Sequence, residues 1–128
     1  MTEKKTYNFE DLDVWKEGRL LRIEIEKLSN RFPADEKYNL KSQMIRASRS
    51  ITNNIAEGYG RFHYQEIIQF CRQGRGSAYE LMDDLIICKD NDFIKDDEYT
   101  ELKNRCNTVI KLLNGYINFL KKQKEMEK

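Results

Sequence analysis

The segment QMIRASRSITNNIAEGYGR, residues 43–61, decides the fold, because it carries an amphipathic helical pattern that ends in Gly-x-Gly. On a helical wheel of 100° per residue, its apolar and small side chains gather on one face together with Leu40. This stripe consists of Leu40, Met44, Ser48, Ile51 and Ile55. Its alternating steps of four and three predict a helix that packs one face against a core.

The opposite face of the same helix is polar and cationic. It carries Arg46, Arg49, Ser50, Asn53, Glu57 and Gly60, with Arg61 at its edge. A flank between the two faces consists of Ile45, Thr52, Ala56 and Tyr59. Such a flank predicts a second packing surface, for a neighbouring helix or for another subunit. Two interpretations of the polar face stay open: a solvated helix surface, which most helical charges form, and a stripe that binds a ligand.

Positive charge is concentrated in the middle third of the chain, although the whole chain has a net charge of only +1. Residues 1–36 carry seven Lys/Arg against nine Asp/Glu, and residues 76–128 carry nine against eleven, so each part has a net charge of −2. Residues 37–75 carry seven against two, a net charge of +5. The composition therefore argues against a protein that is basic throughout and predicts one local surface that attracts anions.

The rest of the sequence predicts helices, because one proline and six glycines leave few turns for a β-protein. Apolar residues spaced by three and four predict helices at about 13–30, 36–59, 64–90 and 96–124. Short links between four long helices predict an all-α, antiparallel up-down-up-down four-helix bundle. We expect a single domain over residues 1–128, with an ordered core at about 9–122 and a loose leader over residues 1–8.

Local signals mark the ends of these helices. Asp11 or Asp13 is expected to cap the first helix, and Phe9 is expected to fold back on the end of the bundle. The pair Phe32-Pro33 ends that helix, because the residue before proline is disfavoured in the helical region. Residues 35 and 36 are acidic, which suits the positive start of the second helix. The third helix is expected to bury a seam of Ile67, Phe70, Gly74, Ser77 or Ala78, Leu81, Leu85 and Cys88.

Apolar side chains outnumber the positions of one seam per helix. The surplus comprises Leu20, Ile23, Ile68, Ile87, Ile110, Leu112, Ile117 and Phe119. Because apolar surface beyond the bundle core favours association, the sequence predicts a homo-oligomer.

The residues offer little for catalysis, for a cofactor or for a metal ion. His63 is the only histidine, so neither a catalytic triad nor a histidine metal site is available within one chain, and no phosphate-binding loop is present. Glu57 is a single carboxylate beside two asparagines, which is weak support for acid–base chemistry. Pairing with Arg46, Arg49 or Arg61, or capping of the end of the second helix, is the simpler interpretation. The sequence predicts a protein that is not an enzyme.

Cysteine usage and hydropathy indicate the compartment. Cys71, Cys88 and Cys106 form an odd set without a CxxC pair, which favours a reducing cytoplasm and argues against a zinc site. No apolar run reaches the length of a membrane span, and the polar, acidic N-terminal residues do not resemble a secretory signal. We expect a cytoplasmic protein without a membrane partner.

Several motifs together cover residues 9–120. They are Phe9-x-Asp11-Leu12-x-Val14-Trp15, Phe32-Pro33 with Glu36 and Leu40, Gln43-x-x-Arg46, Ser50-Ile51-x-x-Asn54-Ile55-Ala56-Glu57-Gly58-x-Gly60-Arg61, and Gly76-Ser77 with Glu80-Leu81. The chain thereby resembles the four helix bundle protein family, first noticed in open reading frames within intervening sequences of bacterial 23S ribosomal RNA. It departs from the family pattern at His63, where a serine cap is common, and at Gln73-Gly74, where an apolar residue and alanine are usual.

The resemblance implies a small, cytoplasmic bacterial bundle that assembles into a ring-shaped homopentamer. Related accessory proteins of diversity-generating retroelements bind nucleic acid and a reverse transcriptase, so RNA, DNA or a protein is the partner that the resemblance suggests. The candidate nucleic-acid-binding residues are Arg46, Arg49, Arg61, Arg72 and Arg75. The motif residues expected to be structural are Asn54, Glu57, Gly58, Gly60, Gly76 and Ser77.

Two functions from different classes remain open at this point. The first is a ring-forming binder of RNA or DNA, which the excess of arginine in the middle third favours. The second is a protein–protein scaffold without nucleic acid, which does not need that excess. In either case the small residues Gly76 and Ser77 are expected to serve close packing between helices or to belong to a ligand surface.

Overall fold

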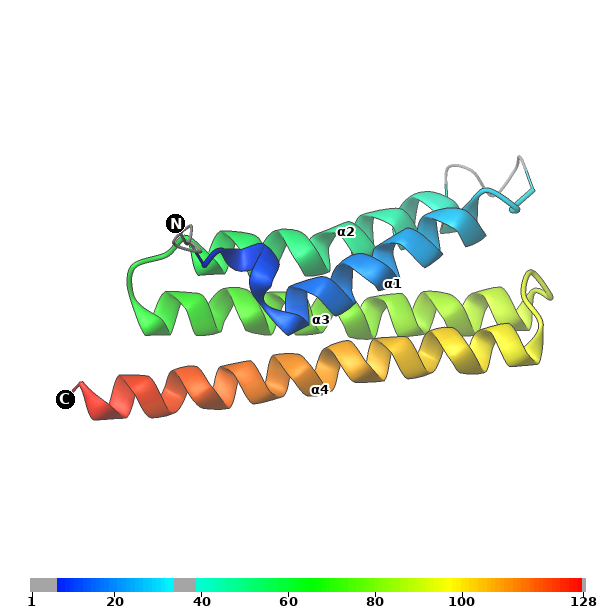
Figure 1. The fold of residues 1–128 in the computed structure, drawn as a ribbon. Coiled ribbons are helices and arrows are strands. Elements are labelled where there is room, and N and C mark those ends of the chain that lie inside the picture. Colours follow the sequence, from blue (N-terminus) through cyan, green and yellow to red (C-terminus); the bar gives the residue numbers. More distant parts are fainter. Residues whose placement is uncertain (1–6, 34–38, 128) are drawn as a thin grey trace, which may run out of the picture.

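The structure is a computed structural model that describes residues 7–33 and 39–127, and it consists of long helices (Figure 1). The elements are the short 3-10 helix η1 (Phe9–Asp11), α1 (Asp13–Ser29), α2 (Leu40–Tyr59), α3 (Tyr64–Asp90) and α4 (Asp96–Met126). The described residues contain no strand. The prediction of an all-α protein built from four helices is confirmed.

Each helix packs on the helices that precede and follow it, and α1 also packs on α4, so the four enclose one core. Contacts between α2 and α3 show how the pair is arranged: Gly58 lies against Phe70, and Ser50 meets Ser77. Residue numbers therefore rise along one helix while they fall along the other. The colours in Figure 1 reverse direction in the same way at each link between helices.

The core confirms the stripe predicted for α2. All five of its members are at most 4% exposed. They meet large side chains from the other three helices, including Leu21, Ile25, Leu81, Leu85, Val109 and Leu113, each at most 1% exposed. Burying one such aliphatic side chain stabilises the fold by about 1.5–3 kcal/mol relative to leaving it in water. Hydrophobic burial of this stripe is therefore what holds α2 in the bundle.

The seam of α3 differs from the prediction in its first two turns. Ile68 and Cys71 are buried, whereas Ile67 and Phe70 are only half-buried. The buried face of α3 is rotated by one position relative to the predicted seam, and Phe70 lies beside Gly58 at the edge of the contact between the two helices.

The predicted surplus of apolar residues is also smaller than expected. Ile68, Ile110 and Ile117 belong to the core, and Leu20, Ile87 and Phe119 are the exposed members of that set.

The start of the bundle differs from the expected capping. Asp11 does not cap α1, because the N-cap of that helix is Leu12, which makes no side-chain hydrogen bond. Instead, Oδ2 of Asp11 accepts from the backbone N–H of Asn8 at 2.8 Å and so closes η1. Phe9 does fold back, with its ring 5.3 Å from that of Trp15. The acidic start expected for the second helix and most of the expected leader lie outside the described residues. The helix itself is described from Leu40.

One charged side chain lies inside the bundle. Asp84 on α3 is 4% exposed, and its Oδ2 has no hydrogen-bond partner among the described residues. Burial raises the pKa of this carboxyl to about 6, and the neighbouring charges of Glu80 and Asp83 act in the same direction. The stability of the bundle should therefore depend on pH.

Candidate nucleic-acid interface

The outward face of α2 forms a shallow groove of about 630 Å³. Its lining residues are Lys41, Ser42, Ile45, Arg46, Arg49, Ser50, Asn53, Asn54 and Glu57. These positions recur at helical spacing opposite the buried stripe, which is why one helix supplies the entire lining. Three cations face one carboxylate in the groove, and hydroxyl and amide groups lie between them. We call this surface the α2 groove.

Arg46 is the least committed cation of the α2 groove. The side chain is exposed, and among the described residues no carboxylate or hydrogen-bond acceptor pairs with it. A guanidinium carries five N–H donors in a planar fork, and it stays charged at any physiological pH. Arg46 can thus bind an anion without breaking a contact with any described residue.

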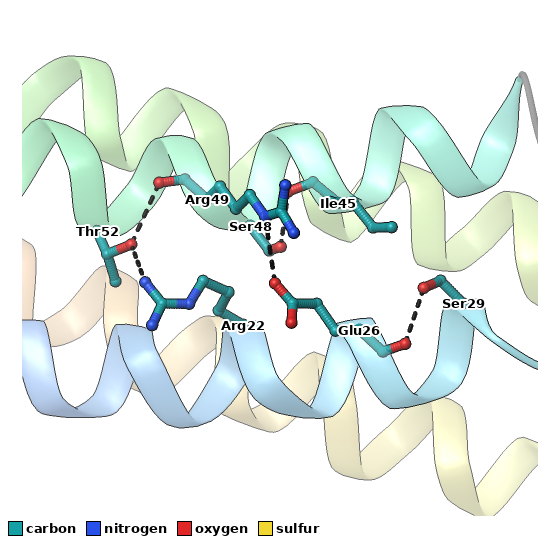
Figure 2. Close-up of polar contacts among 7 residues, drawn as sticks. All are labelled: Arg22, Glu26, Ser29, Ile45, Ser48, Arg49 and Thr52. Carbon is teal, nitrogen blue, oxygen red and sulfur yellow. Dashed lines mark hydrogen bonds and ion pairs between the residues drawn. The ribbon is translucent and has the colours of Figure 1, made fainter.

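Arg49 is held toward α1 by a weak ion pair (Figure 2). Its Nε lies 3.2 Å from Oε1 of Glu26, and both side chains are more than one-third exposed. Exposed pairs of this kind contribute about 0–1 kcal/mol, because water screens them. A phosphate could therefore replace Glu26 at little cost, and the pair meanwhile keeps Arg49 at the edge of the groove.

Arg22 adds a further cation that sequence analysis did not select. Its Nη1 donates to Oγ1 of Thr52 at 3.0 Å, and that hydroxyl donates to the carbonyl of Arg49 at 3.2 Å (Figure 2). No carboxylate among the described residues pairs with Arg22. Arg22 lies in the first third of the chain, whose net charge is negative, so the count of charges did not indicate it. The available signal was its position directly after the seam residue Leu21, at the edge of α1.

Arg61 is largely neutralised by its neighbours. Its Nη2 lies 3.0 Å from Oε1 of Glu57, its Nη1 lies 3.9 Å from Oε2 of Glu66, and its guanidinium lies 4.8 Å from the centre of the Phe70 ring. The interpretation that Glu57 pairs with one of the arginines is confirmed. Glu57 itself is exposed, so its carboxylate is not a buried acid–base group.

The two arginines of α3 do not extend the α2 groove. Arg75 donates from Nη1 to Oδ1 of Asn114 at 2.7 Å, which directs it toward α4. Arg72 is exposed on α3 and pairs with none of the described residues. The structure thus brings Arg46 and Arg49 together, places Arg61 at the α2–α3 link, and leaves Arg72 and Arg75 on another helix. A role in binding stays a prediction for all five.

The polar motif residues form the contact between α2 and α3. The hydroxyls of Ser50 and Ser77 lie 2.8 Å apart, and Nδ2 of Asn54 donates to the carbonyl and hydroxyl of Ser50 at 2.8 and 3.0 Å. A Cβ added to Gly74 would lie 3.5 Å from Cβ of Asn54. Small and hydrogen-bonded side chains therefore let the two helices approach closely. Ser77 has the packing role expected of it.

The motif glycines have three different environments. A Cβ on Gly58 would lie 2.9 Å from Cβ of Phe70, so only glycine fits there without a shift of α3. Gly60 is the C-cap of α2, and its N–H donates to the carbonyls of Ala56 and Glu57. Gly76 is exposed, and a Cβ on it would meet nothing within 4 Å. Among the described residues, Gly58 and Gly74 lie in the close contact between helices and Gly76 does not; that Gly76 belongs to a ligand surface stays a prediction.

Catalytic and metal chemistry find little support in the described residues. No group of three or more His, Cys, Asp or Glu side chains in the described ranges is placed to hold a metal ion. Burial raises the pKa of Cys71 to about 11 and that of Cys106 to about 12, so both thiols stay protonated and unreactive at neutral pH. Within residues 7–33 and 39–127, no helix combines the length and the apolar character that a membrane span needs.

Comparison with known proteins agrees with this architecture. The family model described as 23S rRNA-intervening sequence protein matches residues 10–115. A crystal structure of a protein of unknown function from the S23 ribosomal protein family of Bacteroides thetaiotaomicron aligns with a TM-score of 0.76. The alignment covers 81% of this chain and 97% of that chain at 21% sequence identity, so it shows the fold alone. No curated protein matches the chain.

Proposed function

The chain belongs to the 23S rRNA-intervening sequence protein family, and from that premise we propose that it is a non-enzymatic, homo-oligomeric bundle that binds RNA or DNA through the α2 groove. The observation that carries the proposal is the pair Arg46 and Arg49 in one open groove, with Arg46 free of any carboxylate among the described residues. Their planar guanidinium groups match the geometry of phosphate and bind it through two hydrogen bonds at once.

The composition of the α2 groove favours a ligand with repeated negative charge. Lys41, Arg46 and Arg49 lie along one helix, and Arg22 of α1 bonds to Thr52 beside the groove. The Ser42 hydroxyl and the Asn53 amide supply neutral donors for phosphate oxygens. Because such groups bind phosphate oxygens, which are the same at every nucleotide, we propose binding that is largely independent of sequence.

Fluorescence anisotropy tests this proposal directly. A labelled RNA or DNA should bind the wild-type protein at about 50 mM salt, and the affinity should fall steeply as salt rises, since each neutralised phosphate releases counterions. Absence of binding at that salt concentration would reject the proposal and would favour the scaffold function.

The assembly part of the proposal rests on apolar side chains that a single chain leaves in water. Leu20, Tyr79, Ile86 and Phe119 are each more than 40% exposed. Resemblance to the family supplies the number five, so light scattering should give about five times the mass of one chain. A ring would repeat the α2 groove and raise the avidity for a long nucleic acid. A clean monomer at micromolar concentration would overturn the assembly.

A change on the flank of α2 tests the same assembly. Ala56 is half-buried, and a glutamate in its place would bring an unpaired charge into any contact that this flank makes. We expect Ala56→Glu to shift the protein toward smaller species in light scattering, while circular dichroism stays helical.

Three free, buried cysteines suit a reducing compartment, so we propose that the assembly is cytoplasmic.

A protein–protein scaffold is the second candidate, and one observation favours it. Tyr79 and Ile86 lie two turns apart on α3 at 55% and 41% exposure, and Ile87 beside them is also exposed. That apolar face lies on a different helix from the α2 groove. A scaffold would use this face, and exchange of Arg46 for alanine would leave its partner bound.

A further inference from the structure

The link between α2 and α3 presents the most exposed large hydrophobic side chain of the described residues. Phe62 is 92% exposed, whereas phenylalanine is usually buried. Residues 61–63 are all that separates Gly60, the C-cap of α2, from Tyr64, the first residue of α3. So high an exposure leaves the ring accessible to a ligand.

The backbone on both sides of Phe62 is held in place. The N–H of Arg61 donates to the carbonyl of Gly58 at 3.0 Å, and two amides of the first turn of α3 donate to the carbonyl of His63 at 3.0 and 3.1 Å. The ring of His63 lies 5.4 Å from the Phe62 ring at an interplanar angle of 82°, so the two rings meet edge to face and at least one face of the Phe62 ring stays uncovered. The link therefore offers a positioned ring.

Two cations lie near this link, and one of them connects it to the α2 groove. Arg61 precedes Phe62 in the chain and is held 3.0 Å from Glu57, which lines the near end of the groove. Lys124 on α4 donates to Oε1 of Gln65 at 2.7 Å, which brings a lysine to the first turn of α3. The carboxylates of Glu57 and Glu66 offset Arg61, so the ring is the distinctive feature here and the stronger positive charge lies further along α2.

We propose that Phe62 is a stacking platform for an unpaired base, so that the preferred nucleic acid is single-stranded. The inference rests on the proposed function, because it assumes that the strand's phosphates bind the α2 groove. A single strand exposes the flat faces of its bases, whereas a duplex keeps them stacked inside. Arg49 lies 10 positions before Tyr59, the last residue of α2, which is about 15 Å at helical rise, and Phe62 follows in the link, so several nucleotides fit between the two side chains.

Binding to three ligands by three proteins tests this inference. The ligands are a labelled single-stranded oligonucleotide, the duplex of the same sequence and an abasic chain of the same length. The proteins are the wild type, Phe62→Ala and the matched control Tyr7→Ala, which removes another exposed aromatic ring outside the α2 groove. Phe62→Ala should weaken single-strand binding by roughly 5- to 100-fold, the range for loss of one base–aromatic stack. Its binding of the duplex and of the abasic chain should equal that of the wild type, and Tyr7→Ala should bind all three as the wild type does. Phe62→Trp should retain single-strand binding, because indole also stacks on bases.

The outcomes separate this inference from the proposed function. If the wild type binds the single strand and Phe62→Ala binds it equally well, the stacking platform is overturned while the α2 groove stands. Loss of binding to all three ligands on Phe62→Ala, together with a smaller mass in light scattering, would assign Phe62 to a subunit contact and overturn the platform. A wild type that binds none of the ligands overturns both proposals. Binding to anionic vesicles that only Phe62→Ala abolishes, with the oligonucleotide unaffected, would assign the ring to a membrane surface.

Discussion

The two sides of α2 differ in how many contacts their polar residues make with the rest of the chain. On the side that faces α3, the side chains of Ser50 and Asn54 are hydrogen-bonded, and Gly58 lies in contact with the Phe70 side chain. On the outward side, Arg46 has no partner among the described residues, and Arg49 has only an exposed one. The polar residues of α2 thus divide into a set whose members are bonded within the chain and a set with few partners among the described residues.

This difference teaches that polarity alone does not mark a binding surface. The hydroxyls of Ser50 and Ser77 are polar, but they are hydrogen-bonded to each other, and that of Ser77 also donates to the carbonyl of Gln73. The guanidinium groups of the α2 groove gain little from their present neighbours, since exposed pairs are weak. Mutations on the packed side should change stability, and mutations on the open side should change binding.

The largest effect on the packed side is expected from Gly58. Gly58→Ala places a Cβ 2.9 Å from Cβ of Phe70, which α3 must move to accept. We expect a loss of about 1–3 kcal/mol in the free energy of unfolding, measured by urea denaturation. Gly76→Ala is the matched control, because it adds the same methyl group to open space and should gain about 0.5–1 kcal/mol from helix propensity. Equal effects at the two glycines would contradict the close approach.

A comparable effect, with a dependence on pH, is expected from the buried carboxyl of α3. The pKa of Asp84 in the folded protein is raised from 3.8 to about 6, so the folded state binds the proton more tightly than the unfolded state. Its contribution to stability is fully present below about pH 4 and is lost as pH rises through about 6. Asp84→Asn should therefore stabilise the protein at pH 8 by about 1–3 kcal/mol and should have little effect at pH 4.

The neighbouring residue provides the control for this pH dependence. Asp83 is exposed on the same turn of α3, so Asp83→Asn should change the free energy of unfolding by no more than about 0.5 kcal/mol at either pH. Thermal unfolding from pH 4 to pH 8 measures both variants. A stability difference between Asp84→Asn and the wild type that stays constant over this range would contradict the raised pKa.

A smaller loss is expected from one hydroxyl of the helix contact. Ser77→Ala removes the partner of Ser50 in a half-buried contact and should cost about 0.5–1.5 kcal/mol. Thr108→Ala removes an exposed hydroxyl that bonds only within α4, so its effect should be near zero. Chemical denaturation of both variants compares them. A loss of unfolding free energy at Thr108 that equals or exceeds the loss at Ser77 would contradict a stabilising role for the hydroxyl contact between α2 and α3.

Sequence analysis predicted the helices and the core of α2 well, and physical reasons explain where it failed. The buried stripe from Leu40 to Ile55 follows from the helical period, which needs no knowledge of the neighbouring helix. The roles of Gly58 and Gly76 could not be separated, because they depend on how α2 and α3 are rotated against each other. The same holds for Ile67 and Ile68, where a rotation by one residue decides which is buried.

The candidate site was predicted only in part for a related reason. The excess of arginine indicated Arg46 and Arg49, which share one helix and therefore one groove. Side-chain contacts with other helices decide the rest: Arg75 bonds to α4, and Arg22 of α1 reaches α2. Distance along the sequence does not contain that information.

The measurement that tests the central claim most directly is a salt titration of nucleic-acid binding by Arg46→Ala/Arg49→Ala. Both side chains are exposed, so the free energy of unfolding should change by less than about 0.5 kcal/mol per residue. Each arginine that engages a phosphate adds about 0.9 to the slope of log affinity against log salt for double-stranded DNA, so the slope of the double variant should be flatter by about two per engaged subunit. A weaker affinity with that flatter slope and an intact fold is the result that we predict. An affinity and a slope equal to those of the wild type would contradict the α2 groove as the binding surface.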